Sequence, residues 1–159
     1  MIEPVQDPST EDLALWHRTF APRAFNETWS YLDLDEPSRQ EQEAMLASAL
    51  AQRYHWYAVG TPRHRAIADW QVSRVAAVLG YADLAFRFGE RSLALCIDND
   101  LDAFVTGFAH EAIARAAAEV DDVDTFTEHL ALAKEKLDEI EDPEDRQVLE
   151  SDLAEMSEP

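Results

Sequence analysis

The sequence is poor in several residue types, and each shortage argues against a class of protein. It has a single cysteine, Cys96, so it can form neither an intramolecular disulfide nor a Cys-x-x-Cys redox or zinc motif. Its four glycines form neither a phosphate-binding loop nor a Gly-x-Ser-x-Gly elbow. No apolar run approaches the roughly 18 residues that a membrane span needs. Disulfide-framework, nucleotide-binding, hydrolase and membrane-spanning proteins are therefore disfavoured.

Basic residues are also scarce. There are 13 Lys and Arg against 33 Asp and Glu, which gives a formal net charge of −20. Because this charge repels phosphates and anionic headgroups, we expect neither nucleic acid nor a membrane as a partner. Only two of the bases are lysines, which suits either a high-GC genome or a salt-adapted host. Residues 1–12 carry acids and prolines where a secretory signal has bases and an apolar core, so we expect a soluble, cytoplasmic protein.

What the sequence does contain is helical periodicity, interrupted by capping and turn residues. Ser38 and Glu41 form a capping box, and Thr61-Pro62 is typical of a helix start. The fold class predicted is all-α, with about seven helices. We expect helices over about 10–21 and 24–32, separated by a break or kink at Pro22, then over 38–59, 62–79, 82–97, 101–120, 123–140 and from 143 onward.

The same periodicity predicts which residues are buried. In the first helix the apolar stripe is Leu13, Trp16 and Phe20, which we expect to face the core. Cys96 falls on an apolar face with Leu93 and Ile97, and we expect it to be a small buried residue rather than a reactive thiol.

Two segments in the second half of the chain resemble tetratricopeptide hairpins. In the first, Leu79-Gly80-Tyr81 resembles the turn between the two helices, and its second helix follows with Leu84-Ala85, Phe88, Ser92 and Leu93. In the second, Asp121 to Val123, Phe126, Leu130 and Ala133 lie at similar offsets, with an acid in place of the turn glycine. The two turns are 42 residues apart, against about 34 in the family.

The resemblance implies antiparallel helical hairpins stacked as a short right-handed α-solenoid, in which the first helix of each hairpin lines a concave surface. We expect one domain over 1–159, with an N-terminal helical cap at 1–35, stacked hairpins at 38–140 and a C-terminal capping helix at 143–156. The region 119–159 has 16 acids and 3 bases. It is either a solvated face or a docking surface for a basic partner.

A catalytic or metal-binding constellation is not evident. None of the five histidines pairs at the His-x-x-x-His spacing, so we expect no metal and no cofactor. An enzyme that binds a small molecule or a metal between the central helices stays open as the alternative, with its site among Arg53, His55, Asp69 and Glu111.

The candidate binding residues are cations and aromatics close to one another in the sequence. Arg53 lies on the apolar stripe of its helix, so it must be paired with Asp69 or Glu43, stacked on an aromatic ring, or exposed to a groove. By the resemblance, the inner line of the concave surface contains Trp70, Arg74, Phe108, Glu111 and Arg115. The full set of candidates is Arg53, His55, Trp56, Trp70, Arg74, Phe108, Glu111 and Arg115.

The function expected from these observations is an interaction module that binds a peptide or protein partner in a concave groove, without catalysis. A structural subunit that forms homo-oligomers through exposed helix faces is a further possibility.

Overall fold

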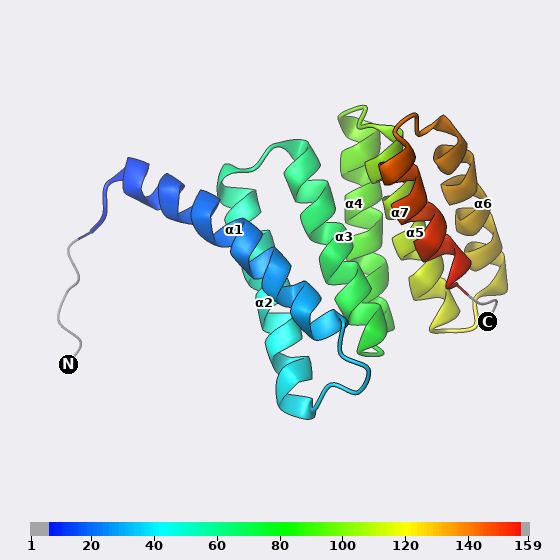
Figure 1. Ribbon diagram of the computed structural model, residues 1–159, viewed down its shortest axis with the longest axis horizontal. Helices are drawn as coiled ribbons and strands as arrows, with labels where there is room; N and C mark the ends of the chain where they lie inside the picture. Colours follow the sequence, from blue (N-terminus) through cyan, green and yellow to red (C-terminus); the bar gives the residue numbers. More distant parts are fainter. Residues whose placement is uncertain (1–6, 157–159) are drawn as a thin grey trace.

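The computed structural model describes residues 7–156, which form seven α-helices and no strand (Figure 1). The predicted all-α class is confirmed. Residues 1–6 and 157–159, which belong to the predicted domain and its N-terminal cap, lie outside the described range. The helices are α1 (Thr10–Leu32), α2 (Arg39–Val59), α3 (Pro62–Val78), α4 (Ala82–Asp98), α5 (Ala103–Ala118), α6 (Val123–Glu139) and α7 (Pro143–Ala154).

Local sequence explains where the helices begin. Ser9, Ser38 and Thr61 each accept a hydrogen bond from the backbone N–H three residues later, which satisfies a donor that has no partner inside the helix. The predicted capping box of Ser38 and Glu41 is confirmed, with Ser38 N donating to Glu41 Oε2 at 2.7 Å. Aspartates do the same for the last three helices, at positions 102, 122 and 142.

Helices that follow one another in the chain pack closely, and they do so most extensively in the pairs α1 with α2, α3 with α4, and α5 with α6. The odd-numbered helices also touch one another, α1 on α3, α3 on α5 and α5 on α7. Within residues 7–156 the even-numbered helices contact only their neighbours in sequence. Figure 1 accordingly shows a row of helices, with α1 at one end and α6 at the other.

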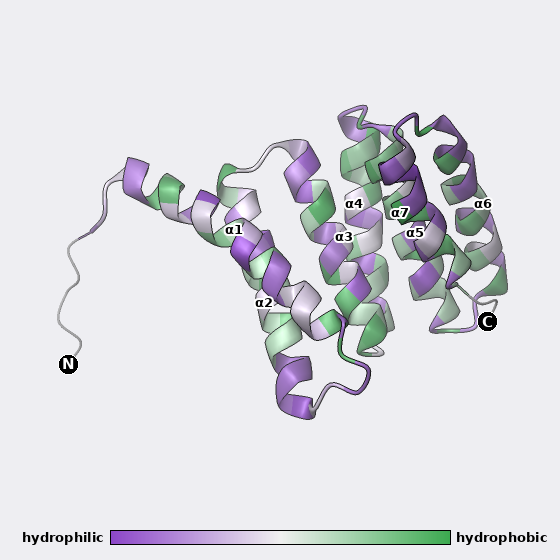
Figure 2. Cartoon of the chain, in the orientation of Figure 1, coloured by the Kyte–Doolittle hydropathy of each residue, from purple (hydrophilic) through white to green (hydrophobic). Residues whose placement is uncertain are grey.

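The core runs along α3 and α5, whose side chains are mostly buried. Alanine occupies much of α5, and small side chains allow helix axes to approach closely. Hydrophilic residues gather elsewhere, for example along α7 and at the start of α2 (Figure 2). Cys96 is buried beside Leu93 as predicted, whereas Ile97 is 69% exposed.

Two predictions for the first helix are wrong. Of the break or kink predicted at Pro22, the break and the separate second helix do not occur: α1 runs from Thr10 to Leu32 as one helix with Pro22 inside it. Leu13, Trp16 and Phe20 are 42%, 49% and 46% exposed, although their spacing predicts burial. The side of α1 that faces the protein is instead centred on Ala21 and Thr28, which are fully buried.

Among residues 7–156, no helix combines the length and the apolar character that crossing a bilayer requires.

Candidate functional site

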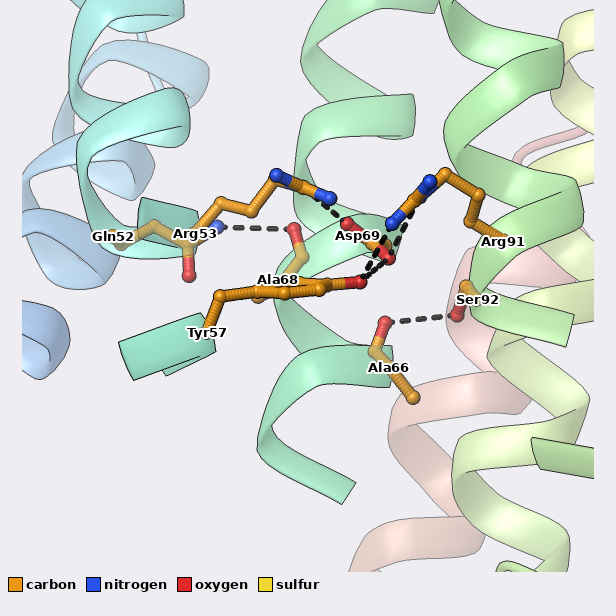
Figure 3. A network of polar contacts seen from close by, with 8 residues as sticks. All are labelled: Gln52, Arg53, Tyr57, Ala66, Ala68, Asp69, Arg91 and Ser92. Atoms are coloured by element: carbon orange, nitrogen blue, oxygen red, sulfur yellow. Dashed lines mark hydrogen bonds and ion pairs between the residues drawn. The ribbon is translucent and has the colours of Figure 1, made fainter. Parts of the chain in front are cut away.

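The candidate residue Arg53 belongs to a buried polar network centred on Asp69 of α3 (Figure 3). Asp69 is fully buried and accepts hydrogen bonds from Arg53 Nε and from the Tyr57 hydroxyl, each at 2.5 Å. Arg91 Nε of α4 lies 3.6 Å from the same carboxylate. Burial and the adjacent Asp69 raise the pKa of Tyr57, so its hydroxyl stays a donor. The predicted Arg53–Asp69 pair is therefore present, and it joins α2, α3 and α4.

In the same region, side chains of α2 and α4 form hydrogen bonds with the backbone of α3. Gln52 Nε2 of α2 donates to the Ala68 carbonyl at 3.0 Å, and Ser92 Oγ of α4 donates to the Ala66 carbonyl at 2.8 Å (Figure 3). Side chains from both neighbouring helices thus bond to one stretch of α3, which makes this part of the molecule a structural junction.

A second buried network centres on Glu111 of α5, which is also fully buried. Its carboxylate accepts a hydrogen bond from Trp70 Nε1 at 2.9 Å and another from Arg115 Nε at 2.7 Å. Arg74 lies 3.7 Å from Glu111 and donates to Asp152 of α7 at 2.7 Å. Burial raises the pKa of Asp152, against the opposing effect of Arg74. The two arginines balance the two carboxylates, so the network carries no net charge.

This second network fixes the walls of an aromatic cluster. The Trp70 ring lies 5.9 Å from the Trp29 ring and 5.1 Å from the Phe108 ring, measured between centroids. The Arg74 guanidinium lies over both indoles, 5.3 Å from the centre of Trp29 and 5.9 Å from that of Trp70. Glu111 and Arg74 therefore act as positioning residues, since they hold the tryptophans in one orientation.

The aromatic cluster encloses a pocket of about 350 Å³ between α1, α3, α5 and α7. Its lining is almost entirely apolar and comprises Phe25, Trp29, Ile67, Trp70, Phe104, Val105, Phe108 and Val148. Val148 is 53% exposed and stands at the border of the pocket with solvent. We call this cavity the aromatic pocket.

Smaller hollows continue the aromatic pocket in two directions. One, of about 140 Å³, shares Phe25 and Ile67 with it and adds Pro22, Trp56 and His64. The indole of Trp56 stacks on the His64 imidazole there, with centroids 4.2 Å apart. The other, of about 240 Å³, shares Phe104. The three hollows share lining residues, and we call them together the groove across α1, α3 and α5.

The hollow beyond Phe104 has a strongly acidic border, which we call the acidic edge. It contains one base, Arg63, and five acids, Asp102, Glu139, Glu141, Asp142 and Asp145. Arg63 pairs with Asp102 at 3.0 Å. Burial would raise the pKa of Asp102, but hydrogen bonds from the Val105 backbone and from Arg63 hold it below its ordinary value. The acidic edge is therefore negatively charged at neutral pH, with one base to offset five acids.

The candidate residues divide between the groove and its support. Trp70 and Phe108 line the aromatic pocket, and Trp56 lines the adjoining hollow. Arg53, Arg74, Glu111 and Arg115 are engaged in the two buried networks. Arg53 and Arg74 are thus paired with carboxylates, and the residues that line the pocket are aromatic or aliphatic. Phe25 and Phe104, which also line the pocket, were not predicted as binding residues, although Phe104 and Phe108 share the four-residue spacing of one helix face.

The histidines form two close pairs that the sequence analysis did not anticipate. His55 Nδ1 lies 2.8 Å from His17 Nδ1, and His110 Nδ1 lies 3.0 Å from His129 Nδ1. Burial, with a smaller contribution from His17, lowers the pKa of His55. Burial, followed by the proximity of His129 and Lys136, lowers the pKa of His110 to about 4. Each pair connects the two helices of a hairpin.

Neither pair extends into a metal-binding cluster. Within residues 7–156 no group of three or more His, Cys, Asp or Glu side chains is placed to hold a metal ion. The residues of the alternative enzyme site are also dispersed, since Arg53 and Asp69, His55, and Glu111 belong to three separate sets of contacts.

Comparison with known proteins gives no guide to the site. No family model, no curated protein and no solved structure gives a significant match to this chain.

Proposed function

We propose that the chain is a tetratricopeptide-like stack of helical hairpins that binds a peptide segment of a partner protein in the groove across α1, α3 and α5. An apolar or aromatic side chain of the peptide enters the aromatic pocket, and one or more basic residues lie against the acidic edge. The observation that supports the proposal most is the aromatic pocket itself, whose walls are held in place by the buried pairs of Glu111 and Arg74.

The dimensions of the pocket favour a side chain as its occupant. At about 350 Å³ it lies at the lower end of the range of roughly 300–1,000 Å³ for ligand pockets. Each neighbouring hollow shares lining residues with the pocket, so a peptide anchored there can also contact residues beyond it. Trp and Phe walls provide large contact areas at low entropic cost, because these side chains are already ordered by their neighbours.

The charge of the acidic edge favours basic residues in the bound peptide, next to its apolar anchor. The five acids and one base of the acidic edge attract a basic peptide, and the net charge of −20 steers such a peptide during association. The successive contacts of α1 with α3, of α3 with α5 and of α5 with α7 support the stacked arrangement, because stacked hairpins require the first helix of each hairpin to touch the next.

A random-peptide display library screened against the purified chain tests the proposal. We expect enrichment of sequences with an aromatic or large aliphatic residue followed within a few positions by Arg or Lys. Val148→Trp fills the mouth of the pocket and should weaken binding of the enriched peptides at least tenfold. The matched control is Val78→Trp, because Val78 is 54% exposed on α3 and lines none of the three hollows.

A second variant tests the basic flank. Glu141→Lys should remove the preference for Arg or Lys while keeping the apolar anchor, whereas Glu135→Lys on α6 should leave both unchanged. A library with no enrichment, or enriched peptides that bind Val148→Trp as tightly as the unmodified chain, would contradict the proposal.

A further inference from the structure

The first half of α1 carries an apolar face that the described part of the chain covers only in part, since Phe20 lies 5.9 Å from the His55 ring of α2, measured between centroids, and remains 46% exposed. In Figure 1 the beginning of α1 projects past α2, away from the row of helices. Leu13, Trp16 and Phe20 lie on this stretch, three and four residues apart and therefore on one side of the helix, and each is more than two-fifths exposed. Tyr54 of α2, which is 66% exposed, borders the same region, since its ring and that of His17 lie 5.5 Å apart.

Two charged residues flank this face in a regular way. Asp12 and Arg23 are 11 residues apart, which is almost exactly three turns of helix, so they lie nearly in line, one on each side of Trp16 and Phe20. The Arg23 guanidinium lies 6.0 Å from the centre of the Phe20 ring. Neither Asp12 nor Arg23 forms an ion pair within residues 7–156.

The face is also unusually neutral for this molecule. Residues 10–25 contain two acids, Glu11 and Asp12, and two arginines, Arg18 and Arg23, in a chain whose net charge is −20. Two copies of the chain repel one another over most of their surfaces. They can approach along the first half of α1 without that penalty.

From these observations we propose that the first half of α1 is the interface for a second copy of this chain, with the two α1 helices packed antiparallel about a twofold axis. When the axis passes between positions 17 and 18, Asp12 of each copy faces Arg23 of the other. Trp16 of each copy then packs beside Phe20 of the other. The charge order along the helix, acidic before the apolar stripe and basic after it, is self-complementary only in this antiparallel arrangement.

The oligomeric state in solution tests the interface. Sedimentation velocity over a range of micromolar concentrations should show a monomer–dimer equilibrium for the unmodified chain. Trp16→Glu should shift it at least tenfold toward the monomer. The matched control, Val123→Glu on α6, replaces a residue that is 50% exposed and should leave the equilibrium unchanged. A chain that stays monomeric at every concentration, or a dimer that Trp16→Glu does not weaken, would overturn the proposal.

Exchanging the charges at positions 12 and 23 tests whether the two α1 helices are antiparallel. Asp12→Lys and Arg23→Glu should each weaken self-association, because each places like charges opposite one another. An equimolar mixture of the two variants should restore dimerisation, since every facing pair in the mixed dimer then has opposite charges. Because Asp12 also caps α1 through Ser9, circular dichroism should confirm that each variant remains helical. Single variants that dimerise normally, or a mixture that stays monomeric, would overturn the antiparallel arrangement. Val148 is not part of this interface, so the outcome is independent of peptide binding.

Discussion

At the scale of single residues, the buried carboxylates of this molecule have partners on neighbouring helices and, for Glu111, also on its own helix. Asp69 receives bonds from α2 and lies within reach of Arg91 on α4, while Glu111 binds residues of α3 and of its own helix. A buried carboxylate is tolerated only when such partners replace the water it has lost. Removing the carboxylate therefore leaves its partners without a counter-charge.

Replacing Asp69 should be costly for this reason. We expect Asp69→Ala to lower the free energy of unfolding by about 3 kcal/mol, because Arg53 and Tyr57 lose their shared acceptor. Chemical denaturation followed by circular dichroism measures the change. The control is Glu43→Ala in the exposed Arg39–Glu43 pair, where we expect a change below about 0.5 kcal/mol. Equal effects of the two substitutions would contradict a structural role for the Asp69 network.

The pair His110–His129 should make stability depend on pH. Burial holds the pKa of His110 at about 4, below its ordinary value of 6.5. Below pH 6.5 the unfolded chain therefore takes up a proton that the folded chain does not. The stability provided by the neutral imidazole is present at pH 7 and is lost as the pH falls toward 4.

Replacing His110 separates its contribution to the pH dependence of stability from that of the many carboxylates. Between pH 7 and pH 4, His110→Asn should lose about 2 kcal/mol less of its free energy of unfolding than the unmodified chain. Denaturation at several pH values measures both slopes. Parallel slopes would show that His110 is protonated equally in the folded and unfolded chain.

At the scale of helices, local sequence signals determined most boundaries correctly. The capping residues Ser38, Thr61 and Asp142 mark helix starts in both the sequence analysis and the structure, because the bonds they make lie within three residues. The prediction was wrong at Pro22, where only the hydrogen bond to the Arg18 carbonyl is lost and the rest of α1 packs on α2. Periodicity also located the stripe of Trp16 and Phe20, but it carries no information on whether another helix covers that stripe.

We therefore expect Pro22 to lower the stability of α1 without ending the helix. We expect Pro22→Ala to raise the free energy of unfolding by about 1 kcal/mol, since alanine restores the missing N–H donor and favours the helix, while the unfolded chain gains freedom. Thermal and chemical denaturation measure the gain. Ala47→Gly, at an exposed position inside α2, should shift stability by a similar amount in the opposite direction. A loss of stability in Pro22→Ala would show that the ring itself packs favourably beside Phe25 and Trp56.

At the scale of the whole molecule, the candidate site was only partly predictable. Trp70 and Phe108 were proposed as binding residues because the resemblance to tetratricopeptide hairpins implies that their helices line a concave surface, and both line the aromatic pocket. Arg74 was placed on the concave surface, and its counter-charge lies far away in the sequence, since it pairs with Asp152, 78 positions later. Tertiary packing alone brings such pairs together. It also determines that Phe25 and Trp29 of α1 close the pocket opposite α5.

The net charge of −20 causes repulsion across the whole molecule, and we expect salt to reduce that repulsion. Raising the NaCl concentration from about 0.01 M to about 0.15 M shortens the screening distance from about 30 Å to about 8 Å. This weakens repulsion among the exposed acids, of which α6 and α7 carry a large share. We expect the melting temperature to rise by about 5 °C across this range.

Charge variants can distinguish screening from a general effect of salt on the buried core. Replacing the exposed Glu135, Glu150 and Glu155 by Gln should raise the melting temperature at low salt and reduce its dependence on salt. Gln147→Glu, which adds an acid to the exposed side of α7, should do the reverse. A core effect would give the same slope for all three proteins, because these positions are exposed and contribute little to the buried apolar surface. Opposite changes in slope would show that repulsion among the acids limits the stability of the fold at low ionic strength.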